Sequence, residues 1–403
     1  MAGIVIIGAG ASGLMAAIAA SEDKDNNVTV FERQGRVGRK ILSTGNGRCN
    51  LTNTICNSKN YHGEDASFAM GALAAFPPQR TIEFFKSIGL LTTEEYGGRV
   101  FPKSGFAGSV LDVLRNICEK NEAEIITDCA VTGSLKRPDG TFEILLGAEK
   151  RYADKVIVAC GGIAGTKLGG VKDGYDILKS LGHSCTKLYP ALTQIRTTPD
   201  YPRALKGIKA NAALKLKNSG RTIFENDGEV LFTETGVSGT AVFEASRFAS
   251  SPPFADEIVL DFLPDMTESD VQDYLVSQKR IFAHLGKDRS LTGALHPRLG
   301  MMICKMAQVG PADMCENLSR SEIDRLIDAA KAFTLKITGV SGFEAAQVTA
   351  GGISTSEFNP QTLESTVTKN LYACGEVLDV DGDCGGYNLQ WAWASGALAG
   401  RTL

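Results

Sequence analysis

Three glycines near the start of the chain have the spacing that binds a dinucleotide. Gly8, Gly10 and Gly13 follow the apolar run 3–7, and residues 14–20 after them are rich in small helix formers. In such a turn the first glycine permits a tight bend. The second lets the backbone approach a pyrophosphate, and the third allows close contact between helix and strand. The helix then directs its N-terminal amides at the phosphates.

An acidic residue stands where the second strand of such a unit should end. Glu32 follows the apolar run 28–31, and a carboxylate at this place accepts hydrogen bonds from a ribose 2′-hydroxyl. It would repel a 2′-phosphate, so the adenosine half belongs to FAD or NAD rather than NADP. A glycine turn without a ligand is the alternative, but the combination of strand, helix and acid favours binding.

A second glycine-rich segment, GRKILSTGNGRCN, spans residues 38–50. Its glycines would let the backbone approach a planar ring. Arg39, Lys40 and Arg48 can balance the charge of a phosphate or a reduced flavin. A solvated basic loop is the alternative, although loops of this length in compact domains are usually functional. Cys49 suggests a reactive thiol, but no histidine lies nearby in sequence, so packing is favoured for it.

The C-terminal region repeats the pattern of a strand followed by glycine and a carboxylate. The run 371–374 leads into Gly375 and Glu376, which is placed to hydrogen-bond a ribityl group or a bridging water. Residues 385–390 then start a helix over 391–400, whose N-terminus would stabilise the negative charge of a reduced ring by ~0.3–2 kcal/mol. A nicotinamide domain needs only the first motif. A flavin, with its ribityl arm and reactive ring, gives a reason for both, so FAD is the predicted cofactor.

These motifs define a predicted cofactor site but no catalytic acid or base. The apolar run 156–160 and the glycines after it resemble a strand end that passes the cofactor in flavoproteins. Trp391 and Trp393 are expected to pack within their helix rather than stack on a flavin. The residues predicted to contact the cofactor are Gly8, Ala9, Gly10, Ser12, Gly13, Glu32, Arg33, Arg39, Lys40, Ser43, Gly45, Gly47, Arg48, Cys49, Asn50, Val131, Ala159, Gly161, Gly162, Gly375, Glu376, Asp381, Gly386, Asn388, Leu389 and Gln390.

The elements that position these residues indicate an α/β chain interrupted by an insert. Residues 1–189 read as the first part of the FAD-binding domain, with a βαβ unit over 3–32 and a long loop over 33–60. Residues 190–265 alternate as antiparallel strands do. Residues 266–335 hold two helices with capping-box openings at Thr267 and Ser319. The chain is expected to return to the FAD-binding domain over 336–403.

Composition excludes several other classes of protein. The chain has 403 residues, 43% of them hydrophobic, and a net charge of −4, which offers no electrostatic case for nucleic acid or an anionic membrane. Its ten cysteines include no Cys-x-x-Cys pair, and its four histidines form no cluster with them, so no metal site is expected. Free thiols fit a reducing, cytoplasmic setting. The oligomeric state stays open.

Several longer segments resemble one family. They are 38–53 (GRKILSTGNGRCNLTN), 98–102 (GRVFP), 173–175 (DGY), 229–239 (EVLFTETGVSG), 348–353 (VTAGGI) and 374–400 (CGEVLDVDGDCGGYNLQWAWASGALAG). The chain resembles the BaiN/YhiN-like NAD(P)/FAD-dependent oxidoreductases, also called aminoacetone-oxidase-like FAD-binding enzymes. The resemblance implies a two-dinucleotide-binding-motif Rossmann-like fold with an inserted antiparallel β-barrel-like domain and a small helical lobe, and non-covalent FAD.

The resemblance also implies redox chemistry, because some relatives reduce double bonds of oxidised bile acids. The family often has Phe-Thr-His where this chain has Phe232, Thr233 and Glu234, so no histidine role is carried over there. The expected function is flavin-mediated hydride transfer, with NAD(P)H-fed reduction of a conjugated C=C bond in a small apolar substrate as one form. NAD(P)H would bind transiently at the ring face, because the middle region has no second Gly-x-Gly-x-x-Gly. An oxidase of small amines or carbonyl compounds and a non-enzymatic redox sensor stay open.

Overall fold

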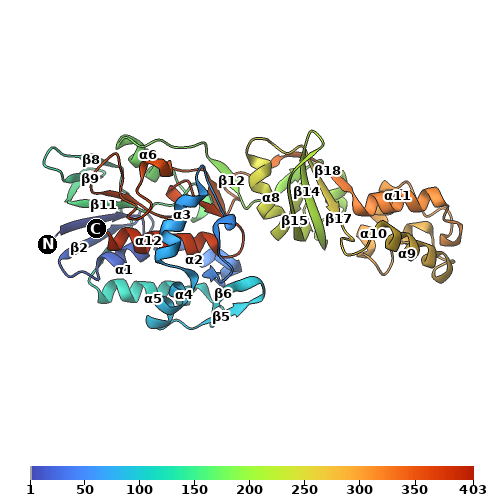
Figure 1. Ribbon diagram of the computed structural model, residues 1–403, viewed down its shortest axis with the longest axis horizontal. Helices are drawn as coiled ribbons and strands as arrows, with labels where there is room; N and C mark the ends of the chain where they lie inside the picture. Colours follow the sequence, from blue (N-terminus) through green and yellow to red (C-terminus); the bar gives the residue numbers. More distant parts are fainter. Residues whose placement is uncertain (1) are drawn as a thin grey trace. The chain divides into compact units, whose positions relative to one another are not determined.

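The chain forms two compact units, seen in Figure 1 in a computed structural model that describes residues 2–403. The first unit runs up to Tyr189 and resumes at Gln347–Leu403, and the second is Pro190–Ala346. The sequence placed the return at residue 336. Strand β18 (Phe333–Val340) instead pairs with strands of the second unit, so the helical lobe ends before Phe333 and the return comes later.

A parallel five-stranded sheet, in the order β20-β11-β1-β2-β7, is the centre of the first unit. Its strands read as continuous apolar runs because helices and loops cover both faces. The edge strand β7 ends at Ile126, and Asp128 beyond it takes a left-handed φ of 54°. The sheet consists of β1 (Ala2–Ile7), β2 (Asn26–Phe31), β7 (Glu124–Ile126), β11 (Lys155–Val158) and β20 (Leu371–Ala373).

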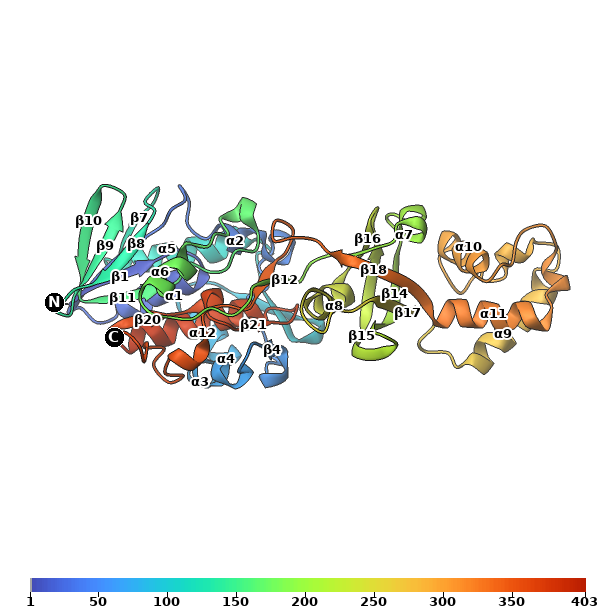
Figure 2. The same ribbon diagram turned by 90° about the horizontal axis from the view of Figure 1, so that it is seen from above.

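Helices of the first unit pack on this sheet and on one another. The first and last of them, α1 and α12, lie side by side in both views (Figure 2). Pro78 begins α4 at its first helical position, where a proline is favoured because its missing N–H needs no partner. The expected loop 33–60 contains a short helix, α2. The helices are α1 (Ala11–Ala20), α2 (Arg39–Ser43), α3 (Ala69–Ala75), α4 (Pro78–Ser87), α5 (Ala107–Lys120), α6 (Asp173–Ser180) and α12 (Tyr387–Arg401).

Small antiparallel sheets complete the first unit. Two strands that the sequence did not predict, β8 and β10, flank β9, and the exposed polar side chains of β10 hide its strand character. Three of the small sheets are β8 (Gly133–Lys136) with β9 (Phe142–Leu146) and β10 (Glu149–Ala153); β3 (Thr52–Asn53) with β6 (Arg99–Pro102) and β5 (Thr92–Glu95); and β4 (Tyr61–His62) with β21 (Asp381–Gly382). A fourth pairs β12 (Tyr189–Ala191) with β19 (Val348–Ala350).

The second unit is a closed six-stranded barrel with attached helices, as the predicted fold class requires. Phe232, Phe262 and Phe333 pack together in its core, with ring centroids 5.4–6.1 Å apart. The predicted capping boxes at Thr267 and Ser319 are present. The strands are β13 (Ile195–Thr197), β14 (Lys209–Asn218), β15 (Arg221–Phe232), β16 (Gly236–Ser238), β17 (Glu257–Asp261) and β18; the helices are α7 (Asp200–Ala204), α8 (Thr240–Ser250), α9 (Glu268–Ile281), α10 (Pro297–Met306) and α11 (Arg320–Lys331).

Candidate FAD site

The three N-terminal glycines differ in how much space a side chain would have at each position. A Cβ on Gly8, whose φ is +104°, would stand 2.7 Å from the carbonyl oxygen of Ala159. A Cβ on Gly13 would stand 1.9 Å from the carbonyl oxygen of Gly8. A Cβ on Gly10 would meet nothing within 4 Å. Gly8 and Gly13 are therefore required by the fold itself, whereas Gly10 leaves a space beside the helix start.

That space lies at an uncapped helix N-terminus. Gly10 is the N-cap of α1, no side chain caps the helix, and its first turn holds no acidic residue. The first amides of a helix have no partner within it and favour an anion. Glu32 lies just beyond β2, where its carboxylate accepts hydrogen bonds from the N–H groups of Ala9 and Gln34, both at 2.9 Å. Carboxylate oxygens retain further lone pairs for a hydroxyl group.

The two ends of the chain meet at this turn. The hydroxyl of Ser12 donates to the carbonyl oxygen of Cys374 at 3.4 Å. The N–H of Gly375 donates to the hydroxyl of Ser395 in α12 at 2.9 Å. A Cβ on Gly396 would stand 2.3 Å from the carbonyl oxygen of Ser12, so α1 and α12 cross in backbone contact. The first and last motifs thus form one structural element.

Lys40 and Glu376 connect the glycine-rich loop to the C-terminal motif. Their Nζ and Oε2 atoms are 3.1 Å apart, with side chains 33% and 20% exposed. Lys40 also donates to the carbonyl oxygen of Gly162 at 3.3 Å, and Glu376 accepts the N–H of Thr349 at 2.9 Å. Because both side chains keep some exposed surface, they can still contact a bound ligand. Gly161, also predicted, lies beside Glu376.

The three predicted arginines have partners within the protein. Arg33 pairs with Asp173 at 2.9 Å, and Arg39 donates to Gln34 and to the carbonyl oxygen of Lys167. Arg48 binds Glu95 and lies over the ring of Phe101, with its guanidinium carbon 4.2 Å from the ring centroid. These pairs hold the loop in place, and nothing in them assigns the arginines to a phosphate.

The N-terminus of α12 abuts the end of the glycine-rich loop. Gly386 is the N-cap with φ +105°, and a Cβ there would stand 2.7 Å from the carbonyl carbon of Thr52 and 2.9 Å from Oδ1 of Asn50. That Oδ1 is buried and has no hydrogen-bond partner among the described residues. A buried acceptor of this kind is costly unless a ligand or water satisfies it.

Other predicted residues are used by the fold. Gln390 is fully buried; its amide accepts the hydroxyls of Thr52 and Thr81 at 2.6 and 2.8 Å and donates to the carbonyl oxygen of Phe76 at 2.7 Å. The amide of Asn388 holds Gly382 by two hydrogen bonds. Among the other predicted residues, Ser43 donates a hydrogen bond to the carbonyl oxygen of Lys40, and Gly45 and Gly47 have positive φ. Val131 and Asp381 are buried, and Leu389 is half-buried.

Cys49 is sealed in the protein. It is fully buried, and burial raises the pKa of its thiol to about 12. A thiol is a nucleophile as the thiolate, so this one is inert at neutral pH. The tryptophans pack as predicted: the indole N–H of Trp391 donates to the carbonyl oxygen of Gly375 and that of Trp393 to Leu51, at 3.1 and 2.9 Å.

One pair near the α12 start is absent from the predicted set. His62 in β4 and Asp383 after β21 lie 2.7 Å apart, between Nε2 and Oδ1. The sequence signal was the second aspartate of the run Asp381-Gly382-Asp383, two positions before Gly385, the first of the glycines that open α12. Its partner could not be read from the sequence, because the two residues are 321 positions apart.

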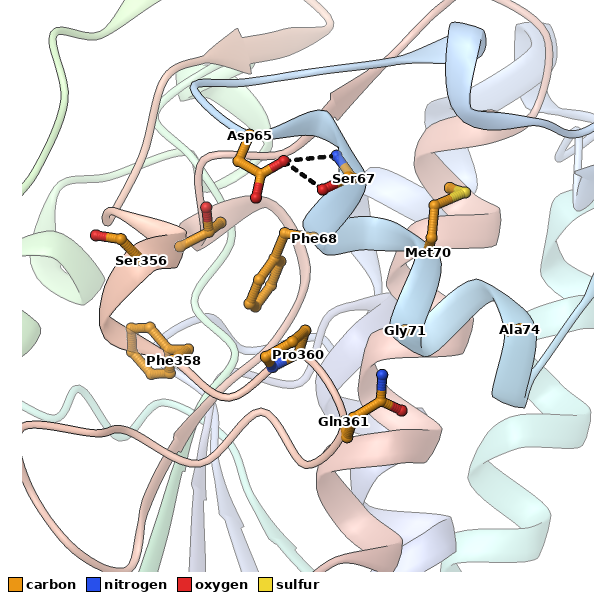
Figure 3. A pocket seen from close by; sticks show the side chains of 11 residues that line it. Asp65, Ser67, Phe68, Met70, Gly71, Ala74, Ser356, Phe358, Pro360 and Gln361 are labelled. Atoms are coloured by element: carbon orange, nitrogen blue, oxygen red, sulfur yellow. Dashed lines mark hydrogen bonds between the residues drawn. The ribbon is translucent and has the colours of Figure 1, made fainter.

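A pocket of about 460 Å³ lies elsewhere in the first unit. Figure 3 shows Phe68, Phe358 and Pro360 around it, with Asp65 bonded to Ser67 at its edge. No residue of the predicted cofactor set is among the described residues that line it. We therefore do not assign the FAD to this pocket. Over residues 2–403 the structure shows no cluster of metal-binding side chains, and no helix that is long and apolar enough to cross a membrane.

The residues present fit FAD. The open space at Gly10 and the uncapped start of α1 suit a pyrophosphate, Glu32 suits a ribose, and the orphaned Oδ1 of Asn50 suits a donor from the ligand. Glu376 and the start of α12 would hold the ribityl and ring end. Bound FAD supplies a carrier that accepts and returns a hydride.

Comparison with known proteins gives matches along almost the whole chain. The family described as HI0933-like protein Rossmann domain matches residues 2–402. The chain is 39% identical to the 3-dehydro-bile acid delta(4,6)-reductase of Clostridium scindens, over 99% of this chain and 98% of that protein. It is 29% identical to the ribosomal RNA dihydrouridine synthase of Escherichia coli, over 99% and 97%, and 28% identical to that of Haemophilus influenzae, over 97% and 96%.

Proposed function

Since the chain belongs to the HI0933-like Rossmann family, we propose that it reduces a C=C bond conjugated to a carbonyl group in a small apolar substrate. The resemblance seen in the sequence and the predicted fold class are confirmed, and the protein is an FAD-dependent oxidoreductase. The observation that carries the finer proposal is the 39% identity, over nearly the full length of both chains, to a protein named as a delta(4,6)-reductase.

A second candidate substrate is a uridine in RNA. Two relatives are named as ribosomal RNA dihydrouridine synthases, at 29% and 28% identity. The 5,6 double bond of uridine is also conjugated to a carbonyl, so both candidates need a hydride on one carbon and a proton on the next. The net charge of −4 favours the small substrate, because RNA-binding surfaces are strongly basic.

NAD(P)H is the proposed electron donor. Glu32 would repel the 2′-phosphate of NADPH at the Gly8–Gly13 turn, and the C-terminal motif beside that turn favours FAD over NADH there. The donor would then bind only while it reduces the cofactor.

The test separates donor, substrate and oxidase chemistry in one experiment. Holoenzyme is mixed anaerobically with NADH or NADPH, and the flavin absorbance is followed. The reduced protein is then offered a 3-oxo-4,6-diene steroid acid, a 3-oxo-4-ene steroid, unmodified ribosomal RNA or air, with FAD-stripped protein as the control. We expect bleaching by one nucleotide and rapid reoxidation by the dienone, with a product heavier by two hydrogens.

The other outcomes are equally distinct. Reoxidation by RNA alone would favour the second candidate, and reoxidation by oxygen with release of peroxide would favour an oxidase. A reduced flavin that no conjugated carbonyl compound and no RNA reoxidises would refute the proposed function.

A further inference from the structure

The pair of His62 and Asp383 lies on two paired strands of the first unit. β4 and β21 run antiparallel, with His62 opposite Asp381. His62 Nε2 is 2.7 Å from Asp383 Oδ1, and the amide of Asn60 donates to Asp383 Oδ2 at 3.3 Å. Each side chain of the pair is 23% exposed, so the pair is held in place but reaches solvent.

This pair is tied to the residues that begin α12. The N–H of Asp383 donates to the carbonyl oxygen of Asn60 at 3.0 Å. The amide of Asn388, in the first turn of α12, donates to the carbonyl oxygen of Asp383 at 3.3 Å. Only Cys384 and Gly385 separate Asp383 from the N-cap Gly386. The imidazole is therefore held at the helix end that the proposed site assigns to the ring of the cofactor.

Three other candidate proton donors of the first unit are buried. Cys49 is buried with a pKa of about 12. Tyr61 is buried; its hydroxyl donates to the carbonyl oxygen of Tyr387, and burial raises its pKa far above the usual value. His183, the other histidine of this unit, has a side chain with no exposed surface and is held by Glu357. Of the two histidines in the first unit, His62 is the one whose side chain is partly exposed.

We propose that His62 is the proton donor of the C=C reduction and that Asp383 is its positioning residue. The assignment rests on the proposed function, in which a reduced flavin supplies the hydride. The hydride and its electron pair form the new C–H bond at the β-carbon, and the π electrons of the double bond move toward the carbonyl. The α-carbon then takes the Nδ1 proton of the doubly protonated His62, whose N–H electron pair stays on the ring and leaves the neutral imidazole with its proton on Nε2. Solvent returns a proton to the ring through its exposed edge.

Asp383 determines which ring nitrogen takes part. A carboxylate can only accept, so its 2.7 Å contact places a proton on Nε2. The proton that reaches the substrate must then leave from Nδ1. Replacing Asp383 would keep the imidazole in the site but let the ring rotate and move its proton between the two nitrogens. The loss of activity should therefore appear in kcat more than in KM.

The kinetic test uses holoenzyme carrying His62→Gln or Asp383→Asn, with His284→Gln, an exposed histidine of the second unit, as the matched control. Reduction by NAD(P)H should proceed at the wild-type rate in all variants. Reoxidation by the dienone should slow about 10²–10⁴-fold in His62→Gln, the range of general acid catalysis. It should slow about tenfold in Asp383→Asn and stay unchanged in the control. The solvent deuterium isotope effect on wild-type reoxidation should be lost in His62→Gln.

Two further measurements guard against a variant that merely misfolds. His62→Ala should regain part of its reoxidation rate with added imidazole, which a packing defect would not do. In ¹⁵N-labelled holoenzyme the His62 signals, identified by their absence from His62→Gln, should show a proton on Nε2 that Asp383→Asn redistributes.

Wild-type reoxidation rates in His62→Gln would overturn the assignment and leave the proposed function standing. A His62 ring protonated on Nδ1 alone would overturn the positioning role of Asp383. A wild-type protein that neither a conjugated carbonyl compound nor RNA reoxidises would overturn both proposals together.

Discussion

Exchanging single glycines of the N-terminal turn separates cofactor binding from folding. Gly10→Ala places a methyl group where the structure has no protein atom within 4 Å, in the space assigned to the pyrophosphate. Gly13→Ala places one 1.9 Å from the carbonyl oxygen of Gly8. The first substitution should therefore impair FAD binding in a folded protein, and the second should impair folding itself.

The magnitudes follow from these surroundings. At Gly10, with φ −80° and ψ −166°, alanine loses about 1 kcal/mol as an N-cap and gains about 0.4–1 kcal/mol from a stiffer unfolded chain. Stability should then stay within about 1 kcal/mol of wild type. A methyl group pressed against a phosphate should cost about 1.4–2.8 kcal/mol, or about 10- to 100-fold in FAD affinity. At Gly13 the gain of about 1 kcal/mol in helix propensity is set against a backbone clash of about 3 kcal/mol or more, a net loss of about 2 kcal/mol.

The assay is urea unfolding of each apoprotein followed by circular dichroism, together with FAD titration followed by flavin fluorescence. The expected result is a wild-type unfolding midpoint with weak FAD binding for Gly10→Ala, and a lowered midpoint for Gly13→Ala. Wild-type FAD affinity in Gly10→Ala would show that the pyrophosphate does not approach this residue. Equal midpoints for Gly13→Ala and wild type would refute the steric reasoning.

Three further predictions concern buried polar groups. Gln390→Leu leaves the hydroxyls of Thr52 and Thr81 and the backbone carbonyl of Phe76 without their partner. Urea unfolding should therefore show that the free energy of unfolding falls by about 3 kcal/mol. Unchanged stability with lost FAD binding would instead assign the amide to the cofactor. Burial lowers the pKa of His183, although its hydrogen bond to Glu357 opposes this. The folded protein therefore binds this proton less well than the unfolded chain, whose histidine has a pKa of about 6.5, and stability should fall as the pH drops below about 6.5. Unfolding measured at about pH 5 and about pH 7.5 should show a smaller difference in His183→Gln than in wild type, and an equal difference would assign the pH dependence to other groups. Cys49, with a pKa of about 12, should resist iodoacetamide in the native protein at about pH 8 and react after denaturation, as peptide mass spectrometry can show; native labelling would contradict its burial.

The sequence by itself determined what depends on neighbouring residues. The βαβ unit with its three glycines and Glu32 follows from local apolar runs and turn chemistry. The helix starts at Thr267 and Ser319 follow from capping, which involves residues three positions apart. Apolar continuity did not reveal β10, because four of its five residues are polar or aromatic and exposed.

The tertiary structure decided which side chains meet. Lys40 and Glu376 are 336 positions apart and His62 and Asp383 are 321 apart, and no periodic pattern specifies such pairs. They form because the register of β4 on β21 and the backbone contact of α1 with α12 bring both ends of the chain together. The same packing turned Gln390 inward. A residue type indicates what chemistry is available, but only the packed fold determines whether that chemistry faces a ligand or another side chain.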